Sequence, residues 1–236
     1  MHLYVIATPI GNLGDVSRRA QEMLAAVDLI LAEDTRRVGL LLQSLGVGKK
    51  ELWSYHDHNE RERVAAIIQR LKQGSKVALV SDAGTPLISD PGYRIVVACH
   101  EAGIPVIAVP GPSAVVAALS ISGLPPDRFR FEGFLPPKGA KRSRRVKQIL
   151  GSDVTSILFE STHKIKKLMQ EISDLEADRL VVICRELTKI HEEVLRGSAL
   201  SLFKEIEQRG GLKGEMVVLL GPKKKAGRAL VDGAEE

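Results

Sequence analysis

Short apolar runs alternate with amphipathic stretches through the first half of the chain. Strands are expected where apolar runs stop at Pro, Gly or acidic residues, and helices where apolar positions recur every three or four residues. The expected strands are residues 3–8, 27–32, 76–80 and 105–109, and the expected helices are residues 16–26, 38–45, 61–71, 93–101 and 113–121. This βα alternation predicts a mostly parallel, Rossmann-like sheet with helices on both faces.

The composition changes near residues 123–127, where two prolines follow Gly123-Leu124. We place a domain boundary there, which gives an N-terminal α/β domain over residues 1–122 and a smaller, mixed α/β domain over residues 123–236. The second domain's expected strands are residues 129–134, 154–159, 180–184, 193–196 and 216–220, with helices near 164–172 and 199–207. It ends in a short basic tail that contains Lys223, Lys224 and Lys225.

Glycine and proline gather where the expected strands of the first domain end. Three of the four strand-end loops contain both, at residues 8–12, 81–92 and 110–113. Glycine lets a backbone approach a ligand closely, and proline removes a donor and stiffens the turn. Each loop alone fits an ordinary turn. Three of them at one sheet edge favour a rigid small-molecule cleft.

The carboxylates Glu33 and Asp34 follow the second expected strand. Because ligands bind beyond the carboxyl ends of parallel strands, these two side chains are candidates for acid–base chemistry, with Arg36 or Arg37 nearby to hold them ionised. Equally, Asp34 or Thr35 could cap the helix that follows.

Net charge is modest, with 34 Lys and Arg against 29 Asp and Glu, or +5. Six cations without an acidic neighbour lie between residues 136 and 147: Lys138, Lys141, Arg142, Arg144, Arg145 and Lys147. A charge run is often a solvated face. With Pro136, Pro137 and Gly139 beside it, we interpret this one as a mobile loop that grips nucleic-acid phosphates. Nine aromatic residues in the whole chain disfavour a broad base-stacking platform.

Several common motifs do not occur in the sequence. Gly11-Asn12-Leu13-Gly14 is not the dinucleotide fingerprint GxGxxG, and GxxxxGK[ST], HExxH and GxSxG are missing. These absences disfavour hydride transfer on a common Rossmann site, P-loop phosphoryl transfer and zincin proteolysis.

No apolar run is long enough to span a bilayer, and the N-terminus does not resemble a secretion signal. Cys99 and Cys184 lie far apart in apolar stretches, which is typical of buried thiols in a reducing cytoplasm.

Three further segments each allow two interpretations. His56-Asp57-His58 has metal-ligand spacing but no evident third ligand, so we expect hydrogen bonds to a neighbouring loop and no metal. The segment Glu160-Ser161-Thr162-His163 is either a helix N-cap box or part of a cleft. The segment Arg185-Glu186-Leu187-Thr188-Lys189 is either a surface ion pair or a substrate clamp.

Together, these motifs resemble the small-subunit ribosomal RNA methyltransferase I family, within the tetrapyrrole-methylase-like class. The resemblance runs in order from about Leu3 to Leu220. Its motifs are Thr8-Pro9-Ile10-Gly11-Asn12-Leu13, Ala32-Glu33-Asp34-Thr35-Arg36, His56-Asp57-His58-Asn59-Glu60, residues 81–92, Pro110-Gly111-Pro112-Ser113-Ala114, Glu132-Gly133-Phe134-Leu135-Pro136, Glu160-Ser161-Thr162-His163, Arg185-Glu186-Leu187-Thr188-Lys189 and Lys213-Gly214-Glu215-Met216.

The resemblance implies a tetrapyrrole methylase fold with S-adenosylmethionine bound in a cleft between two α/β domains. It also implies a homodimer that methylates the 2′-hydroxyl of a cytidine in 16S ribosomal RNA. The positions that match cofactor-lining positions of this class are Pro9, Ile10, Gly84, Thr85, Ile88, Ser113, Ala114, Phe159, Glu160, Gly214, Glu215 and Met216. Related chains often continue with a helical C-terminal extension, whereas this sequence stops soon after Lys225.

A ribose 2′-hydroxyl is a poor nucleophile at neutral pH, so a base is expected beside it. From its position at a strand end, we assign that role to Asp34, held by Glu33 and Arg36. Two other functions stay open: a tetrapyrrole or corrin methyltransferase of the same class, and a non-catalytic RNA-binding factor of ribosome assembly.

Overall fold

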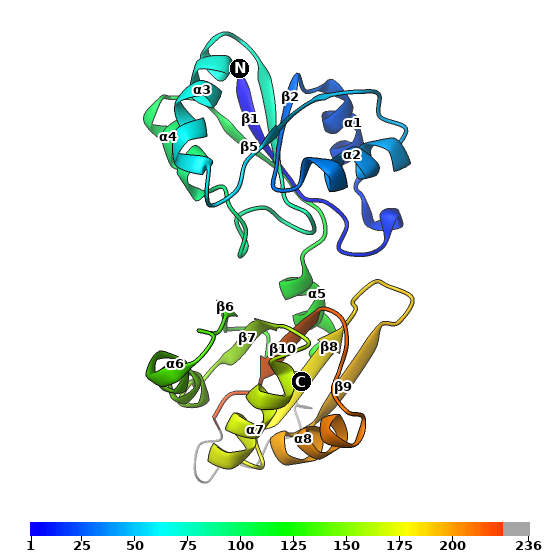
Figure 1. The fold of residues 1–236 in the computed structure, drawn as a ribbon, viewed down its shortest axis with the longest axis vertical. Helices are drawn as coiled ribbons and strands as arrows, with labels where there is room; N and C mark the ends of the chain where they lie inside the picture. The colour runs from blue at the N-terminus through cyan, green and yellow to red at the C-terminus, as the bar shows by residue number, and fades with distance from the viewer. Residues whose placement is uncertain (224–236) are drawn as a thin grey trace, which may run out of the picture. The chain divides into compact units, whose positions relative to one another are not determined.

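The computed structural model describes residues 1–223, and its chain forms two compact units. The first comprises Met1–Ala114, and the second begins at Val115 (Figure 1). The helix expected at residues 113–121 therefore counts with the second unit. Lys224 and Lys225 of the expected basic tail lie outside the described residues. Within residues 1–223, no helix has the length and apolar character needed to cross a membrane.

The first unit is a doubly wound α/β sheet, as the alternation of patterns predicts. Its strands pair in the order β3-β2-β4-β1-β5, and every pair is parallel. The strands are β1 (His2–Ile6), β2 (Leu29–Ala32), β3 (Glu51–Ser54), β4 (Lys76–Val80) and β5 (Val106–Val109). The helices are the 3₁₀ turn η1 (Leu13–Asp15), α1 (Arg18–Ala26), α2 (Thr35–Ser44), α3 (Glu60–Lys72) and α4 (Tyr93–Glu101).

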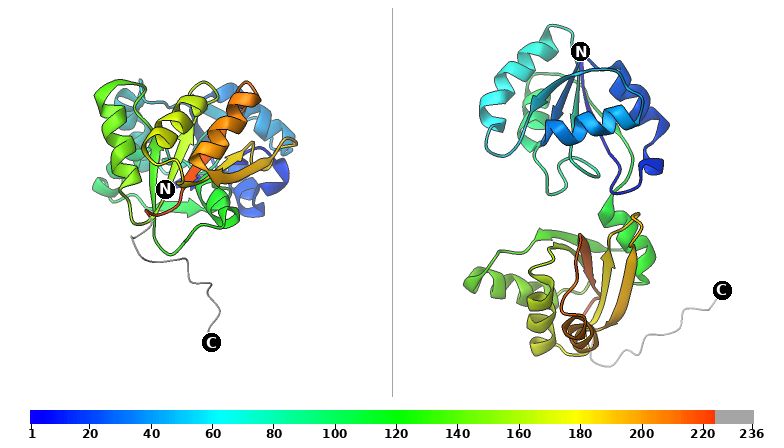
Figure 2. Two further views of the ribbon diagram at one scale, coloured as in Figure 1. Left: turned by 90° about the horizontal axis from the view of Figure 1, so that it is seen from below. Right: turned by 45° about the vertical axis from the view of Figure 1, so that its right-hand side comes forward.

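Two separate apolar cores explain why both faces of this sheet are covered. Alternate residues of the strands point to opposite faces, so Leu29 and Leu31 of β2 pack with α3 and α4 while Ile30 and Ala32 pack with α1 and α2. The views of Figures 1 and 2 show the two helix pairs on opposite sides of the sheet. From β2 the chain turns toward β3, and from β4 it turns toward β5. The sheet's topological switch point therefore lies between β2 and β4.

The second unit is a mixed α/β sheet, again as expected. Its strands pair in the order β6-β7-β10-β8-β9, with β6 and β7 parallel and the other pairs antiparallel. The strands are β6 (Phe129–Phe134), β7 (Thr155–Glu160), β8 (Leu180–Arg185), β9 (Glu193–Ser198) and β10 (Met216–Leu220). The helices are α5 (Ala114–Ser122), α6 (Gly139–Leu150), α7 (Ile165–Leu175) and α8 (Ala199–Gln208), of which α6, α7 and α8 share one apolar core with the sheet.

Two expectations about local structure were wrong. Strand β3 is missing from the expected elements, because it is a partly exposed edge strand whose sequence, Glu-Leu-Trp-Ser, has little apolar character. The basic stretch is not a mobile loop but helix α6. Its apolar residues Val146, Ile149 and Leu150 are buried on one face together with Arg142, and the other cations of the helix are exposed.

Candidate functional site

Three strand-end loops of the first unit are joined by hydrogen bonds at the carboxyl edge of the sheet. Thr8 and Gly84 form an isolated antiparallel bridge, with N–O distances of 2.9 and 3.0 Å. The hydroxyl of Thr85 donates to the carbonyl oxygen of Pro112 at 3.0 Å. These contacts tie the loops after β1, β4 and β5 together. The edge is thus a fixed surface of glycine, proline and small side chains.

Gly84 is the residue that this arrangement depends on most. Its φ of +82° is in the left-handed region, which suits glycine. A Cβ at this position would lie 3.2 Å from Cγ2 of Ile10. The structure therefore brings together Ile10, Gly84 and Thr85, three of the residues that the resemblance assigns to the cofactor.

The remaining first-unit residues of that assignment lie beside these contacts. Pro9 follows the bridge residue Thr8 and is half-buried, while Ser113 and Ala114 follow Pro112 and lead into α5. Ile88 is exposed between Leu87 and Ser89, whose φ values are +73° and +67°. Non-glycine residues in this region carry backbone strain, which is concentrated at functional sites. Ile88 is flanked by two such residues, which indicates that the surrounding structure fixes the backbone of this loop.

Asp34 occupies the helix-capping role that the sequence left open. Its carboxylate accepts the backbone N–H of Arg36 at 2.9 Å and the Arg36 guanidinium at 2.8 and 3.1 Å. These hydrogen bonds hold the pKa of Asp34 far below its usual range. A carboxylate that binds protons so weakly is a poor general base near neutral pH. The base role of Asp34 therefore stays a prediction that its surroundings disfavour.

Four other carboxylates share this sheet edge: Glu33, which was assigned beside Asp34 from the sequence, and Asp57, Asp82 and Asp90, for which the sequence predicted no catalytic role. The pKa of Asp90 is raised to about 6, first by burial and then by the charges of Glu33, Asp82 and Asp57. Burial and the same neighbours Asp82 and Asp57 also raise the pKa of Glu33. Asp82 accepts the backbone N–H of Asp34 at 3.1 Å. This edge thus carries a negative potential, which stabilises a bound cation.

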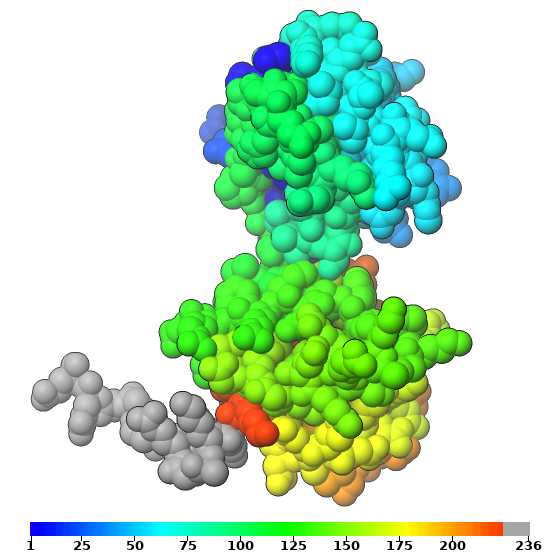
Figure 3. Space-filling model, turned by 90° about the vertical axis from the view of Figure 1, so that its left-hand side faces the viewer, coloured from blue at the N-terminus to red at the C-terminus, as the bar shows by residue number. Residues whose placement is uncertain are grey.

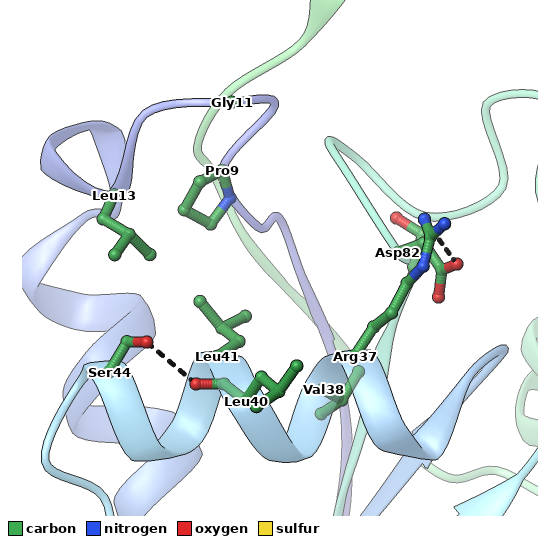
Figure 4. A pocket seen from close by; sticks show the side chains of 10 residues that line it. Pro9, Gly11, Leu13, Arg37, Val38, Leu40, Leu41, Ser44 and Asp82 are labelled. Atoms are coloured by element: carbon green, nitrogen blue, oxygen red, sulfur yellow. Dashed lines mark hydrogen bonds and ion pairs between the residues drawn. The ribbon is translucent and has the colours of Figure 1, made fainter. Parts of the chain in front are cut away.

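A pocket of about 260 Å³ opens beside the switch point (Figure 4). One side is apolar, formed by Leu13, Leu40 and Leu41, and the other carries Arg37 and Asp82, which form an ion pair at 3.2 Å. The lining residues are Pro9, Gly11, Leu13, Arg37, Val38, Leu40, Leu41, Ser44, Ser81 and Asp82. Its volume is just below the range of whole small-molecule sites, so it suits one part of a ligand.

The second-unit residues assigned to the cofactor gather at one end of its sheet. Met216 pairs with Glu160 across β10 and β7, and Phe159 lies next to Glu160. Gly214 has a φ of +98°, and its backbone N–H donates to the Thr162 hydroxyl at 3.1 Å. The structure thus brings these neighbouring positions together, while the side chain of Glu215 is exposed and pairs with Lys189.

Arg142 is not available to bind RNA, which corrects part of the basic set. Its residue surface is 1% exposed, and its guanidinium pairs with Glu171 at 2.8 Å and approaches Glu160 at 3.6 Å. Arg145 is exposed but pairs with Glu132. Lys138, Lys141, Arg144 and Lys147 are exposed, and no ion pair involves them within residues 1–223. The unpaired positive charge of α6 and of its N-cap residue Lys138 therefore comes from these four residues.

Arg142→Ala is expected to lower the free energy of unfolding by about 3–5 kcal/mol, because it leaves the buried Glu160 carboxylate without its partner. Arg144→Ala, on the exposed side of the same helix, is expected to change it by less than about 0.5 kcal/mol. Urea unfolding of the two variants measures the difference. Equal stability of both variants would contradict a structural role for Arg142.

Two of the three segments with open interpretations have contacts that bear on the choice. Asn59 accepts the backbone N–H of His56 at 2.9 Å, so His56 takes part in ordering its own loop. No group of three His, Cys, Asp or Glu suited to a metal occurs among residues 1–223. Lys189 pairs with both Glu186 and Glu215, at 3.0 and 2.9 Å, which favours the ion-pair interpretation of the segment at 185–189.

Comparison with known proteins identifies the class. The family model described as Tetrapyrrole (Corrin/Porphyrin) Methylases matches residues 2–202, and the chain belongs to this family. The fold agrees with solved structures. The methyltransferase CobJ superposes with a TM-score of 0.69 at 17% identity, covering 96% of this chain and 97% of that one. The uroporphyrin-III-C-methyltransferase of Thermus thermophilus superposes with a TM-score of 0.62 at 21% sequence identity, covering 93% of this chain and 94% of that one.

Much closer relatives share one name, "Ribosomal RNA small subunit methyltransferase I". The Escherichia coli O157:H7 protein is 49% identical, over 92% of this chain and 77% of its own. The Haemophilus influenzae protein is 47% identical, over 95% of this chain and 80% of its own. The Thermotoga maritima protein is 44% identical, over 94% of this chain and 98% of its own. The chain is thus similar to these proteins along nearly its whole length.

Methylases of this family use S-adenosylmethionine as the methyl donor. The carboxylates and backbone groups at the first unit's sheet edge suit S-adenosylmethionine. Its sulfonium and amino group are cations, and the carboxylates of Glu33, Asp82 and Asp90 give the edge a negative potential. The loops fixed by Thr8 and Gly84 present backbone at close range, which suits the flat adenine ring of the donor.

Proposed function

We propose that this chain transfers a methyl group from S-adenosylmethionine to the 2′-hydroxyl of a cytidine in 16S ribosomal RNA. The observation that carries the proposal is the 44–49% identity to relatives named for methylation of small-subunit ribosomal RNA. The alternative acceptor, a tetrapyrrole, rests on fold-level similarity at 17–21% identity. We also propose that the protein is a homodimer and acts in the cytoplasm.

The bound donor supplies an electrophilic methyl group on its sulfonium, and the transfer is a displacement that depends on alignment. We propose that the first unit's rigid loops hold the donor, with Pro9, Ile10, Gly84, Thr85, Ile88, Ser113 and Ala114 as its contacts. We propose five further contacts of the donor from the second unit, at Phe159, Glu160, Gly214, Glu215 and Met216. Of these residues, Glu160 is buried against Arg142, so we propose that its side chain acts by fixing the end of β7 at which the other contacts lie.

Asp90 is our proposed base for the 2′-hydroxyl, in place of Asp34. A general base works best when its pKa lies near the operating pH, and the pKa of Asp90 is about 6. The neighbouring carboxylates of Glu33 and Asp82 keep it there by disfavouring a further negative charge. Asp90 in its ionised form accepts the proton as the oxygen attacks.

The exposed cations of α6 are expected to bind phosphates of the acceptor. Replacing Lys138, Lys141, Arg144 and Lys147 together by alanine should lower the slope of log affinity against log salt by up to about 3, since each single-strand phosphate contact contributes about 0.7. A variant with four other exposed cations replaced, Lys49, Arg61, Lys72 and Lys204, has the same net charge and should keep the slope. Equal slopes in the two variants would contradict a local RNA contact.

The proposed function is tested by offering three acceptors with methyl-labelled S-adenosylmethionine: small ribosomal subunits, free 16S ribosomal RNA and a tetrapyrrole. We expect label in the RNA of at least one ribosomal acceptor. Label in the tetrapyrrole alone would replace the proposal by a corrin or porphyrin methyltransferase. RNA binding without binding of S-adenosylmethionine would indicate an assembly factor instead.

A further inference from the structure

Phe134, at the carboxyl end of β6, is a large apolar side chain that the fold leaves in solvent. It is 58% exposed, although the next residue, Leu135, is buried in the core with α6. The proposed methyl transfer assigns no role to Phe134.

The ring of Phe134 packs against a neighbouring ring on one side and faces solvent on the other. It pairs with Phe159 in the register of β6 and β7, and the two ring centroids lie 5.5 Å apart at an interplanar angle of 59°. Phe159 in turn packs against Phe131 at 4.9 Å. Three rings thus support one another, and the outermost is more than half exposed. A ring that already packs against another loses less conformational entropy than an isolated side chain when a second flat group stacks on it.

Several cationic residues follow Phe134 in the sequence. Lys138 is four residues further on, so its Cα lies within about 14 Å of that of Phe134, whatever path the backbone takes. Lys141 and Arg144 follow on α6, exposed and without an ion pair among the described residues. The lime-coloured surface of the second unit in Figure 3 includes this helix. A polyanion bound by Lys138 would therefore pass within reach of the exposed ring.

We propose that Phe134 stacks on an unpaired base of the RNA whose phosphates α6 binds. The inference rests on the proposed function, because it takes RNA as the acceptor. A base and a phosphate backbone together need both a π face and cations, and this segment supplies both. A single ring is sufficient for one base, so the scarcity of aromatic residues in the chain does not oppose it. An apolar partner surface would gain nothing from the unpaired cations.

The test measures binding of a single-stranded RNA of about 12 nucleotides by fluorescence anisotropy over a range of salt concentrations. Phe134→Ala is expected to weaken binding about tenfold without changing the salt slope, because stacking releases no counterions. Phe134→Trp should bind as tightly as the parent protein. Phe129→Ala, at the other end of β6 and also exposed, is the matched control and should change affinity less than twofold.

Each other outcome has a definite meaning. Unchanged affinity of Phe134→Ala, or no binding of the oligonucleotide by the parent protein, would overturn the inference. So would a change in sedimentation of Phe134→Ala, which would assign the ring to contact with a second copy. Methylation of small subunits is measured in parallel. Stacking without methyl transfer would overturn the proposed function alone, and methyl transfer without stacking would overturn this inference alone.

Discussion

Gly84→Val is expected to weaken binding of S-adenosylmethionine more than 100-fold while the chain still folds. Valine is a steric outlier at the φ of +82° that this position holds, and the cost is about 2 kcal/mol. Its Cβ would lie 3.2 Å from Cγ2 of Ile10, and its γ carbons reach further, so the Ile10 side chain must move, the Thr8–Gly84 bridge must shift, or both. The proposed donor contacts lie on both sides of that bridge. Titration calorimetry with S-adenosylmethionine measures the loss.

Gly46→Val separates backbone strain from damage to the site. Gly46 has a similar φ of +67°, but it follows α2 and a Cβ there would meet nothing within 4 Å. It should lose a comparable amount of stability and keep its affinity for S-adenosylmethionine. If both variants bind as the parent does, the strand-end loops do not hold the donor.

Asp90→Asn is expected to make the protein more stable and at least 100-fold less active. The pKa of Asp90 is raised from 3.8 to about 6, so its stabilising contribution is full below about pH 4 and is lost as the pH rises through 6. Asparagine carries no charge, and its advantage should grow over that window to about 2 kcal/mol above pH 7, less than the ~3 kcal/mol of the full shift because Asp90 is partly exposed to solvent. The same substitution removes the proposed proton acceptor, which contributes about 10²–10⁴-fold.

The comparison variant is Asp34→Asn, which keeps a side chain that caps a helix as well as aspartate does. It should retain most of the turnover, whereas the activity of the parent should fall as the pH drops below about 6. Thermal unfolding and single-turnover methylation, each between pH 5 and 8, measure these effects. Full loss of turnover in Asp34→Asn, with Asp90→Asn active, would return the base role to Asp34.

Much of the fold could be predicted because it depends on local pattern. The buried runs of β2 and β4 are apolar on both faces, as parallel strands between two helix layers must be. Strand β3 escaped prediction because an edge strand buries little and needs few apolar residues. Helix α6 was missed because its cations outnumber its buried apolar residues, so charge obscured the helical spacing of Val146, Ile149 and Leu150.

Parts of the candidate site were predictable from the sequence only where glycine, proline or acidic residues directly follow a parallel strand. The glycine and proline loops around Gly84 met that condition, since parallel strands end at one edge. The raised pKa of Asp90 did not meet it, because the shift arises first from burial of the carboxylate and then from charges that come from three different loops. The segment Ser89-Asp90-Pro91-Gly92 predicted a loop, but it did not show that Glu33 and Asp57 lie near Asp90. Burial of Arg142 likewise follows from packing of α6 against Glu160 and Glu171, which a run of basic letters cannot show.

The most direct measurement is nucleoside mass spectrometry of 16S ribosomal RNA from small subunits lacking the modification, after incubation with this protein and S-adenosylmethionine. The account requires one 2′-O-methylcytidine per RNA, formed by the parent protein and lost in Gly84→Val. Methylation on a base, on another nucleotide or on no RNA at all, by protein that binds S-adenosylmethionine, would contradict it.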